Sequence, residues 1–383
     1  MNSKSFQEKY YVDRHDTNCY KWDSDKAKNK LPMWIADTDF KTPQKIIDSL
    51  KLKLEEGSYG YGFLPRDYYD VMISWNKKIS NVEYKKEWIR FSKGAIDGIC
   101  QIINSLTHEK DSILICEPVY NPFREIIKVS KRKLVVSNLI KNNYHFEMDF
   151  KDIENKIVKN NVKMLILCSP HNPVSRVWNE AELEKLFAIT HKYSVIVVSD
   201  EVHSELIMPG FHFIPSLSFK KYQNDIITIN AESKTFSLAL FNHCHIVIPN
   251  KKFRKEIDEY QNAHHIASPN AFNGLSSYYA YKYGEDWLDG FKKTVYENYL
   301  YLKKSLKDYC DINDLEGTYL AFADFSKSIK EGNAANKLYE SADVYLNAGD
   351  TYGKGYEKWV RFNLATSLDN VKKACRRIKK ALS

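Results

Sequence analysis

The stretch that decides the fold is Val162–His203, which reads VKMLILCSPHNPVSRVWNEAELEKLFAITHKYSVIVVSDEVH. It begins with the apolar run Val162–Cys168 and later contains a second such run, Ser194–Val198, both rich in branched apolar residues. Between the two runs, apolar residues recur at helical spacing over Glu180–Lys192. A strand, a helix and a second strand in this order predict two parallel strands joined by a crossover helix.

The same alternation of apolar runs and helical stretches extends on both sides, from about residue 85 onward. The other apolar runs are Trp88–Phe91, Ser112–Cys116, Leu134–Val136, Ile226–Ile229 and His245–Ile248. Several of them are continuous rather than alternating, which is typical of strands buried on both faces of a sheet. The sequence therefore predicts an α/β fold with a mostly parallel, seven-stranded sheet between layers of helices.

The pattern changes after Pro269, where a smaller α+β domain is expected. It is expected to contain one long helix (Asn270–Tyr309), a strand (within Thr318–Phe325), a helix (Ala334–Glu340), strands near Val344 and Val360, and a terminal helix from Asn370. We predict a large domain over residues 46–269 and a small domain over residues 270–383. Residues 1–45 carry no strong periodicity and are expected to pack with the small domain.

Composition excludes several classes of protein. With 43% hydrophobic and 28% charged residues, the chain is neither disordered nor a coiled coil. The net charge of +8 is spread along the chain, so no nucleic-acid partner is expected. No apolar run is long enough for a membrane helix, and Met1–Thr17 lacks the apolar segment of a secretory signal. The seven cysteines form no C-x-x-C pair, so a reduced, cytoplasmic protein without disulfides or zinc is expected.

Polar residues follow three of the predicted strands at their carboxyl ends. They are Asn172 after the first, Asp200 and His203 after the second, and Lys234 after the third. Because ligands of open parallel sheets bind beyond these ends, we expect the four side chains to lie close together. No glycine-rich nucleotide motif is present. A lysine with an aspartate fits pyridoxal phosphate (PLP), which needs an amine for its Schiff base and a carboxylate for its ring nitrogen.

Other residues fit further parts of the same cofactor. Asn172 and His203 are expected to hydrogen-bond the hydroxyl oxygen of its ring. Ala95 and Ile96 open a predicted helix directly after a strand, where backbone N–H groups bind phosphate. Tyr120, beyond another strand, is expected to stack on the ring.

A second group of candidate ligands is interpreted as structural. His243 and His245 flank Cys244 and alternate on a predicted strand, and His264 and His265 follow further on. They lack the closed ligand spacing of a metal site, so no metal is expected.

Short motifs spread over nearly the whole chain share the order and spacing of one enzyme family. They are KWD (Lys21–Asp23), LPMWIADTDF (Leu31–Phe40), YGY (Tyr59–Tyr61), EPVYNPF (Glu117–Phe123), PHNPV (Pro170–Val174), DEVHS (Asp200–Ser204), SKTF (Ser233–Phe236), GTYL (Gly317–Leu320) and VRFN (Val360–Asn363). On these motifs the sequence resembles the fold-type-I PLP enzymes of the class I/II aminotransferase superfamily, which have the aspartate aminotransferase fold. More closely, it resembles cystathionine β-lyases (C–S lyases) of the MalY/PatB type.

The resemblance implies further roles for individual residues. Lys234 would be the Schiff-base lysine and the catalytic residue, and Ser233 would lie near the phosphate. Tyr61 matches a tyrosine that reaches the phosphate of a neighbouring subunit, which implies a homodimer with shared sites. Arg361 matches an arginine that pairs with the α-carboxylate of an amino-acid substrate. Ser175 departs from the family pattern, since a glycine usually stands there.

The activity that the resemblance implies is cleavage of cystathionine or a related cysteine S-conjugate to a thiol, pyruvate and ammonia. An aminotransferase is the alternative, because the same lysine, aspartate, asparagine and arginine serve both reactions. A non-catalytic protein that keeps the fold is a third possibility, but such a protein would not need all four residues together.

Overall fold

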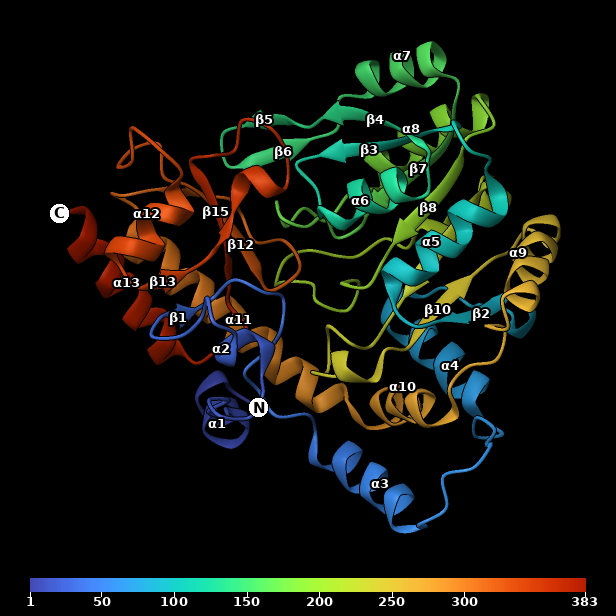
Figure 1. Cartoon of the computed structure of the whole chain (residues 1–383), viewed down its shortest axis with the longest axis horizontal. Helices are drawn as coiled ribbons and strands as arrows, with labels where there is room; N and C mark the ends of the chain where they lie inside the picture. Colours follow the sequence, from blue (N-terminus) through green and yellow to red (C-terminus); the bar gives the residue numbers. More distant parts are fainter.

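The seven apolar runs form one seven-stranded sheet in the computed structural model, which describes residues 1–383 (Figure 1). In spatial order the strands are β2 (Ile89–Ser92), β10 (Cys244–Val247), β9 (Ile226–Asn230), β8 (Ile196–Asp200), β7 (Val162–Cys168), β3 (Ser112–Glu117) and β4 (Lys133–Asn138). Strand β10 is antiparallel to both of its neighbours, and the other pairs are parallel. The prediction of a mostly parallel seven-stranded sheet is confirmed.

Helices cover both faces of this sheet. Ile113 and Ile115 of β3 pack in a core with α5, α6 and α9, whereas Leu114 and Cys116 belong to the core shared with α7 and α8. Burial on both faces explains why these strands are continuously apolar. The helices of this lobe are α3 (Gln44–Glu55), α4 (Tyr68–Ser80), α5 (Ala95–Leu106), α6 (Pro122–Val129), α7 (Phe150–Asn160), α8 (Glu180–Lys192), α9 (Lys251–Ala263) and α10 (Ala271–Tyr283), of which α3 packs on α10.

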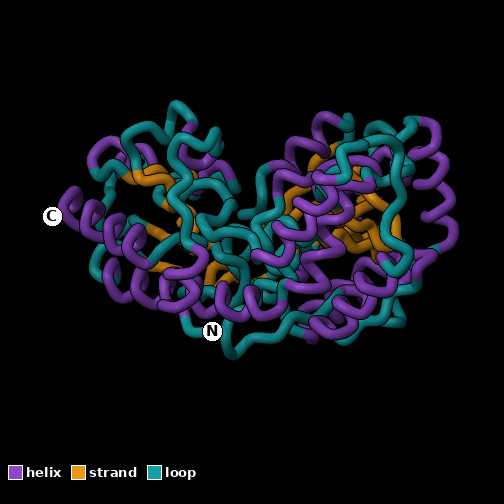
Figure 2. Tube along the Cα trace, turned by 90° about the horizontal axis from the view of Figure 1, so that it is seen from below, coloured by secondary structure: helices purple, strands orange, loops and turns teal.

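A second, antiparallel sheet forms the core of the other lobe in Figure 2. Its strands lie in the order β11 (Asp311–Ile312), β12 (Leu320–Asp324), β15 (Trp359–Asn363) and β14 (Asn347–Ala348). Helices α11 (Glu285–Leu306), α12 (Ala334–Ser341) and α13 (Leu368–Leu382) belong to the same part of the chain. No helix in the structure is both long and apolar enough to cross a membrane.

Short elements complete the chain. They are the helices α1 (Ser3–Tyr10) and α2 (Tyr20–Asp23), the strand pairs β1 (Leu31–Pro32) with β13 (Val344–Tyr345) and β5 (Ile140–Asn142) with β6 (His145–Glu147), and the 3-10 turns η1 (Lys86–Trp88), η2 (Ser216–Ser218), η3 (Gln223–Asp225), η4 (Ala239–Phe241) and η5 (Gly349–Thr351).

The amino-terminal segment runs along β15 and is anchored there. The backbone N–H of Asn363 donates to the carbonyl of Met33 at 2.8 Å, and the N–H of Asp39 donates to the carbonyl of Ala365 at 2.9 Å. The Asp39 carboxylate, fully buried, pairs with the Lys21 ammonium at 2.8 Å. These contacts fix the backbone between Met33 and Asp39, which borders the site described below.

The prediction of one helix over Asn270–Tyr309 is wrong, because the chain forms α10 and α11 with a break at Gly284. A Cβ atom at Gly284 would lie 2.3 Å from the ring of Phe236, so only glycine fits there. Glu285 and Asp286 then begin α11, where acidic side chains stabilise the new amino terminus.

Candidate active site

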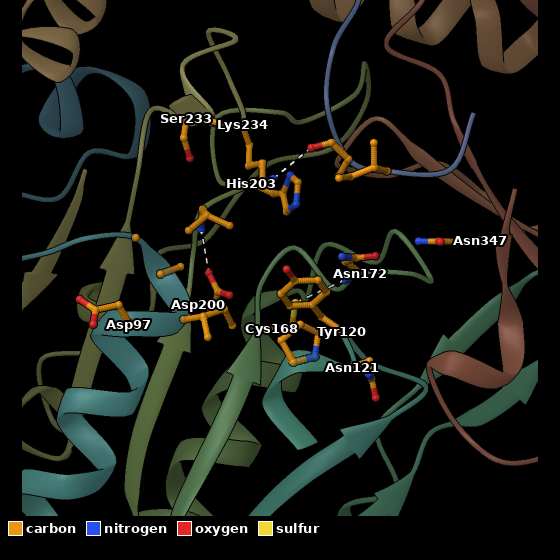
Figure 3. Close-up of a pocket in the computed structure, with 18 of the residues that line it drawn as sticks. Asp97, Tyr120, Asn121, Cys168, Asn172, Asp200, His203, Ser233, Lys234 and Asn347 are labelled. Atoms are coloured by element: carbon orange, nitrogen blue, oxygen red, sulfur yellow. Dashed lines mark hydrogen bonds between the residues drawn. The ribbon is translucent and has the colours of Figure 1, made fainter. Parts of the chain in front are cut away.

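One pocket of about 540 Å³ lies beyond the carboxyl ends of β7, β8 and β9 (Figure 3). Its wall on the sheet side contains nearly all of the residues predicted from sequence, namely Ala95, Ile96, Tyr120, Asn172, Asp200, His203, Ser233 and Lys234. The opposite wall comes from the second lobe and the amino-terminal segment, and it contains Arg361. The pocket therefore brings together residues from three distant parts of the sequence.

Lys234 lies in the loop after β9 and points into the pocket (Figure 3). Its Nζ atom donates a hydrogen bond to the carbonyl of Ala36 at 3.0 Å. The loop is turned by backbone hydrogen bonds from Thr235 and Phe236 to the carbonyl of Glu232. Burial lowers the pKa of Lys234, which favours the neutral amine that can act as a nucleophile or base.

Asp200 is the last residue of β8 and is buried at the bottom of the pocket. One carboxylate oxygen accepts the backbone N–H of Val202 at 3.2 Å. Burial raises the pKa of Asp200 to about 6, against the lowering effects of Val202 and the Lys234 ammonium. A cationic ring nitrogen next to this carboxylate would compensate for that burial.

This burial predicts a pH effect on the cofactor-free protein. Between about pH 4 and pH 6 the folded chain retains the Asp200 proton while the unfolded chain releases it, so folding loses stability as pH rises. The contribution lost is about 3 kcal/mol. The Asp200→Asn variant, which cannot ionise, should gain about this much relative to the natural chain between pH 4 and pH 7 in denaturant titrations. A stability difference that stays constant over this range would contradict the assignment.

His203 and Asn172 border the same part of the pocket. The Nδ1 atom of His203 is buried and has no hydrogen-bond partner within the chain. Burial lowers the pKa of His203 to about 3, so the imidazole is neutral. The Oδ1 atom of Asn172 accepts from Arg361 at 3.1 Å. Tyr120 also lines the pocket, and its ring packs edge-on against Phe123.

The end of the pocket at α5 has the features of an anion site. Gly94 has φ of +132°, and a Cβ atom placed there would meet nothing within 4 Å. Open space therefore lies directly before Ala95 and Ile96, whose N–H groups begin α5 and have no partner in the preceding turn. Ser233 lines the pocket as well and lies one residue before Lys234. Backbone N–H groups at a helix start, with an open approach, suit a phosphate.

Arg361 is a buried cation without an anionic partner in the chain. It lies on β15 and is 2% exposed. Its Nη1 and Nη2 atoms donate to Asn172 and to the carbonyl of Trp34, while its Nε atom has no partner. Because a buried charge is costly unless it is paired, this guanidinium is suited to bind an anionic group in the pocket.

Tyr61 is the one predicted site residue that lies outside this pocket. It belongs to the loop between α3 and α4, and its side chain is fully exposed. Tyr59 and Phe63 of the same loop are also exposed.

His243 and His245 form a buried hydrogen-bonded group with Tyr68. The Tyr68 hydroxyl lies 2.8 Å from Nε2 of His243 and 2.7 Å from Nε2 of His245. No three or more His, Cys, Asp or Glu side chains of the chain lie together in a way that could hold a metal ion. Through Tyr68, these contacts connect α4 with β10 and with the residue before it.

Sequence reasoning did not single out several pocket residues of the second lobe and the amino-terminal segment, chiefly Trp34, Asn347 and Tyr352. Trp34 stands within a family-like motif, but no local pattern marked its side chain. Asn347 lies on a strand of only two residues, which gives no periodic signal.

The chain matches the family model of class I and II aminotransferases over residues 39–378. It is 30% identical to cystathionine beta-lyase PatB of Bacillus subtilis (strain 168), over 97% of this chain and 98% of that protein. A PLP-bound protein of Clostridium difficile 630, provisionally named an aminotransferase, is similar at 36% identity and TM-score 0.93, covering 98% of this chain and 99% of that one. The PLP-bound C-S lyase of Staphylococcus hominis is similar at 30% identity and TM-score 0.91, covering 97% and 96%.

Proposed function

The chain belongs to the class I and II aminotransferase family, within the group of PatB-related cystathionine β-lyases, and we infer from this that it is a PLP-dependent C–S β-lyase. We propose that it cleaves cystathionine or a related cysteine S-conjugate to a thiol, pyruvate and ammonia. The buried guanidinium of Arg361, which has no anionic partner and lies in the same pocket as Lys234 and Asp200, supports an amino-acid substrate, and the similarity to PatB and to the C-S lyase favours elimination over amino transfer. A substrate α-carboxylate supplies the missing anion.

The residues of the pocket fit PLP. The buried carboxylate of Asp200 suits a cationic ring nitrogen, and the Nδ1 atom of His203 is a buried polar atom that lacks a partner. We propose that Lys234 holds the cofactor covalently, with Asn172 and His203 at the ring hydroxyl and Tyr120 on the ring face. At the other end of the pocket, the open space at Gly94 suits the phosphate.

We propose that the phosphate is held by Ala95, Ile96 and Ser233, and by Tyr61 of a second subunit. When bound, PLP supplies a ring that accepts the electrons released at the α-carbon of the substrate.

The chain's own residues bind the substrate and move its proton. The planar guanidinium of Arg361 binds the α-carboxylate with two parallel hydrogen bonds. Lys234, whose pKa is lowered by burial, accepts the α-proton at Nζ. The Asp200 carboxylate would hold the ring nitrogen of bound PLP in its protonated form. Loss of the sulfur substituent from the β-carbon then leads to pyruvate and ammonia.

An aminotransferase remains the second candidate, because a similar PLP-bound structure is provisionally named one. The two reactions differ in whether an amino-group acceptor is needed. With S-ethyl-L-cysteine and no keto acid, we expect the holoenzyme to release thiol and pyruvate in equal amounts over many turnovers. One equivalent per site of the S-ethyl keto acid, with the C–S bond intact and no thiol released, would instead identify an aminotransferase.

We propose a homodimer with shared sites. Tyr59, Tyr61 and Phe63 of one loop, and Leu240 of η4, are large exposed apolar or aromatic side chains, which favour contact with a second copy. We also propose a cytoplasmic location, which is supported by seven unpaired cysteines, six of them buried.

We propose the division into residues 1–45, 46–269 and 270–383 expected from sequence, with the second boundary moved toward Gly284. Pairing of β1 with β13 supports packing of the first segment with the small domain. Packing of α10 against α3 and α4 favours a boundary nearer Gly284 than Asn270.

A further inference from the structure

The pocket wall opposite Lys234 carries a tyrosine that the reaction described so far does not use. Tyr352 follows η5 and lines the pocket together with Asn347 and Thr351, which are uncharged. Only 3% of Tyr352 is exposed. Its position in the pocket is next to Arg361, the residue that would hold the substrate by its α-carboxylate.

The ring of Tyr352 is fixed in place from several sides. The Arg361 guanidinium lies 5.3 Å from the ring centroid, a cation–π contact. The backbone N–H of Tyr352 donates to the carbonyl of Gly349 at 3.0 Å, and its carbonyl accepts from Val119 at 3.0 Å. The second of these bonds connects the turn to the segment that follows β3, so the phenol keeps its place relative to the large sheet.

The Tyr352 hydroxyl accepts a hydrogen bond within the chain, and its own proton has no acceptor there. The Nδ2 atom of Asn347 donates to the phenol oxygen at 2.9 Å, so that amide uses an acceptor site of the oxygen. No other polar group of the chain contacts this hydroxyl. Burial raises the pKa of Tyr352, so the group retains its proton. Asn347, which lines the pocket together with Tyr352, lies across the cavity from Asp200 in Figure 3.

We propose that Tyr352 donates the proton that the leaving sulfur takes up when the Cβ–S bond breaks, and that Asn347 positions the phenol for this transfer. This inference rests on the proposed lyase activity. Tyr352 would thus be a catalytic residue and Asn347 a positioning residue.

The step balances with the groups named. Lys234 takes the α-proton, and the electron pair of the Cα–H bond forms the bond between Cα and Cβ. The electron pair of the Cβ–S bond leaves with sulfur, which takes the phenolic proton and departs as a thiol. The phenol regains a proton from water, and Lys234 returns its proton to water before the next turnover.

The need for this proton depends on the leaving thiol. An alkyl thiolate such as ethanethiolate is more basic than an aryl thiolate and is the poorer leaving group of the two, so its departure gains more from protonation. An aryl thiolate is much less basic and departs without protonation. A general acid contributes about 10²- to 10⁴-fold where protonation is required.

The test compares S-ethyl-L-cysteine with S-(4-nitrophenyl)-L-cysteine in the natural holoenzyme and in Tyr352→Phe. Phenylalanine retains the ring against Arg361 and removes only the hydroxyl. We expect Tyr352→Phe to lower kcat for the S-ethyl substrate by about 10²-fold and to lower it at least tenfold less for the S-nitrophenyl substrate. Asn347→Ala should also lower kcat more for the S-ethyl substrate than for the S-nitrophenyl substrate, by a smaller factor than Tyr352→Phe does.

Tyr356→Phe is the matched control, since Tyr356 follows in the same loop but does not line the pocket. It should leave the ratio of the two activities unchanged. Equal losses of both activities in Tyr352→Phe would overturn the inference, because they would indicate a structural role. Absence of cleavage of either substrate by the natural holoenzyme would instead overturn the lyase proposal itself.

Discussion

Replacing Lys234 by alanine is expected to lower kcat for every cysteine S-conjugate by about 10⁴-fold or more. The same change should abolish the visible absorbance of the covalently bound cofactor. Both effects follow from one amine, which lines the pocket and has its pKa lowered by desolvation there. The two readouts are steady-state thiol release and the absorbance spectrum of protein purified in the presence of PLP.

The matched control is Lys234→Arg, which keeps a cation at this position. Arginine does not release its proton at neutral pH, so it serves neither as a nucleophile nor as a base. We expect this variant to be as inactive as Lys234→Ala. If either variant retained the turnover of the natural enzyme, Lys234 would not carry the reaction, and another base would have to be sought in the pocket.

The second large effect is expected for Arg361→Lys. Lysine keeps the charge but lacks the planar fork, and it loses the bonds to Asn172 and to the carbonyl of Trp34. We expect kcat/KM to fall by about 10²- to 10³-fold, or about 3–4 kcal/mol. The affinity for PLP, measured by equilibrium dialysis, should change far less than kcat/KM.

A substrate analogue shows whether this loss comes from the α-carboxylate. The natural enzyme and Arg361→Lys are compared on a cysteine S-conjugate and on its α-amide, which lacks the charge. In this double cycle, replacing the carboxylate by the amide should lower kcat/KM much more for the natural enzyme than for Arg361→Lys. An equal decrease of kcat/KM in both proteins would show that Arg361 does not bind the α-carboxylate.

Much of the large sheet was predictable because its strands are buried on both faces. Strand β7 has the predicted bounds Val162–Cys168, and α8 has the predicted bounds Glu180–Lys192. Strand β8 is shifted from Ser194–Val198 to Ile196–Asp200, because Ser194 takes a left-handed conformation with φ of +54° after the helix. Apolar continuity does not reveal such a turn residue.

The sheet side of the pocket was predictable for a related reason. Parallel strands end at one edge, so polar residues after successive strands meet there, as Asn172, Asp200 and Lys234 do. Ser175 was also marked by the family pattern as a position that favours glycine, and its φ is +63°.

The opposite wall could not be predicted from local sequence patterns. Trp34, Asn347 and Tyr352 meet Arg361 only because β14 pairs with β15 and the amino-terminal segment runs along β15. These contacts join segments separated by more than 300 residues in the case of Trp34 and Arg361. The hydroxyl of Tyr352 is positioned by a hydrogen bond from Asn347, which lies on a two-residue strand that is too short to show an alternating hydrophobic pattern.

The measurement that tests the lyase assignment most directly follows the nitrogen of the substrate. The holoenzyme is given S-ethyl-L-cysteine carrying isotope-labelled nitrogen together with an excess of a keto acid, so that elimination and amino transfer compete in one tube. We predict that nearly all of the label appears as ammonium, with thiol and pyruvate in equal amounts. Label that appears instead in a new amino acid, with the C–S bond intact, would contradict the assignment and identify an aminotransferase.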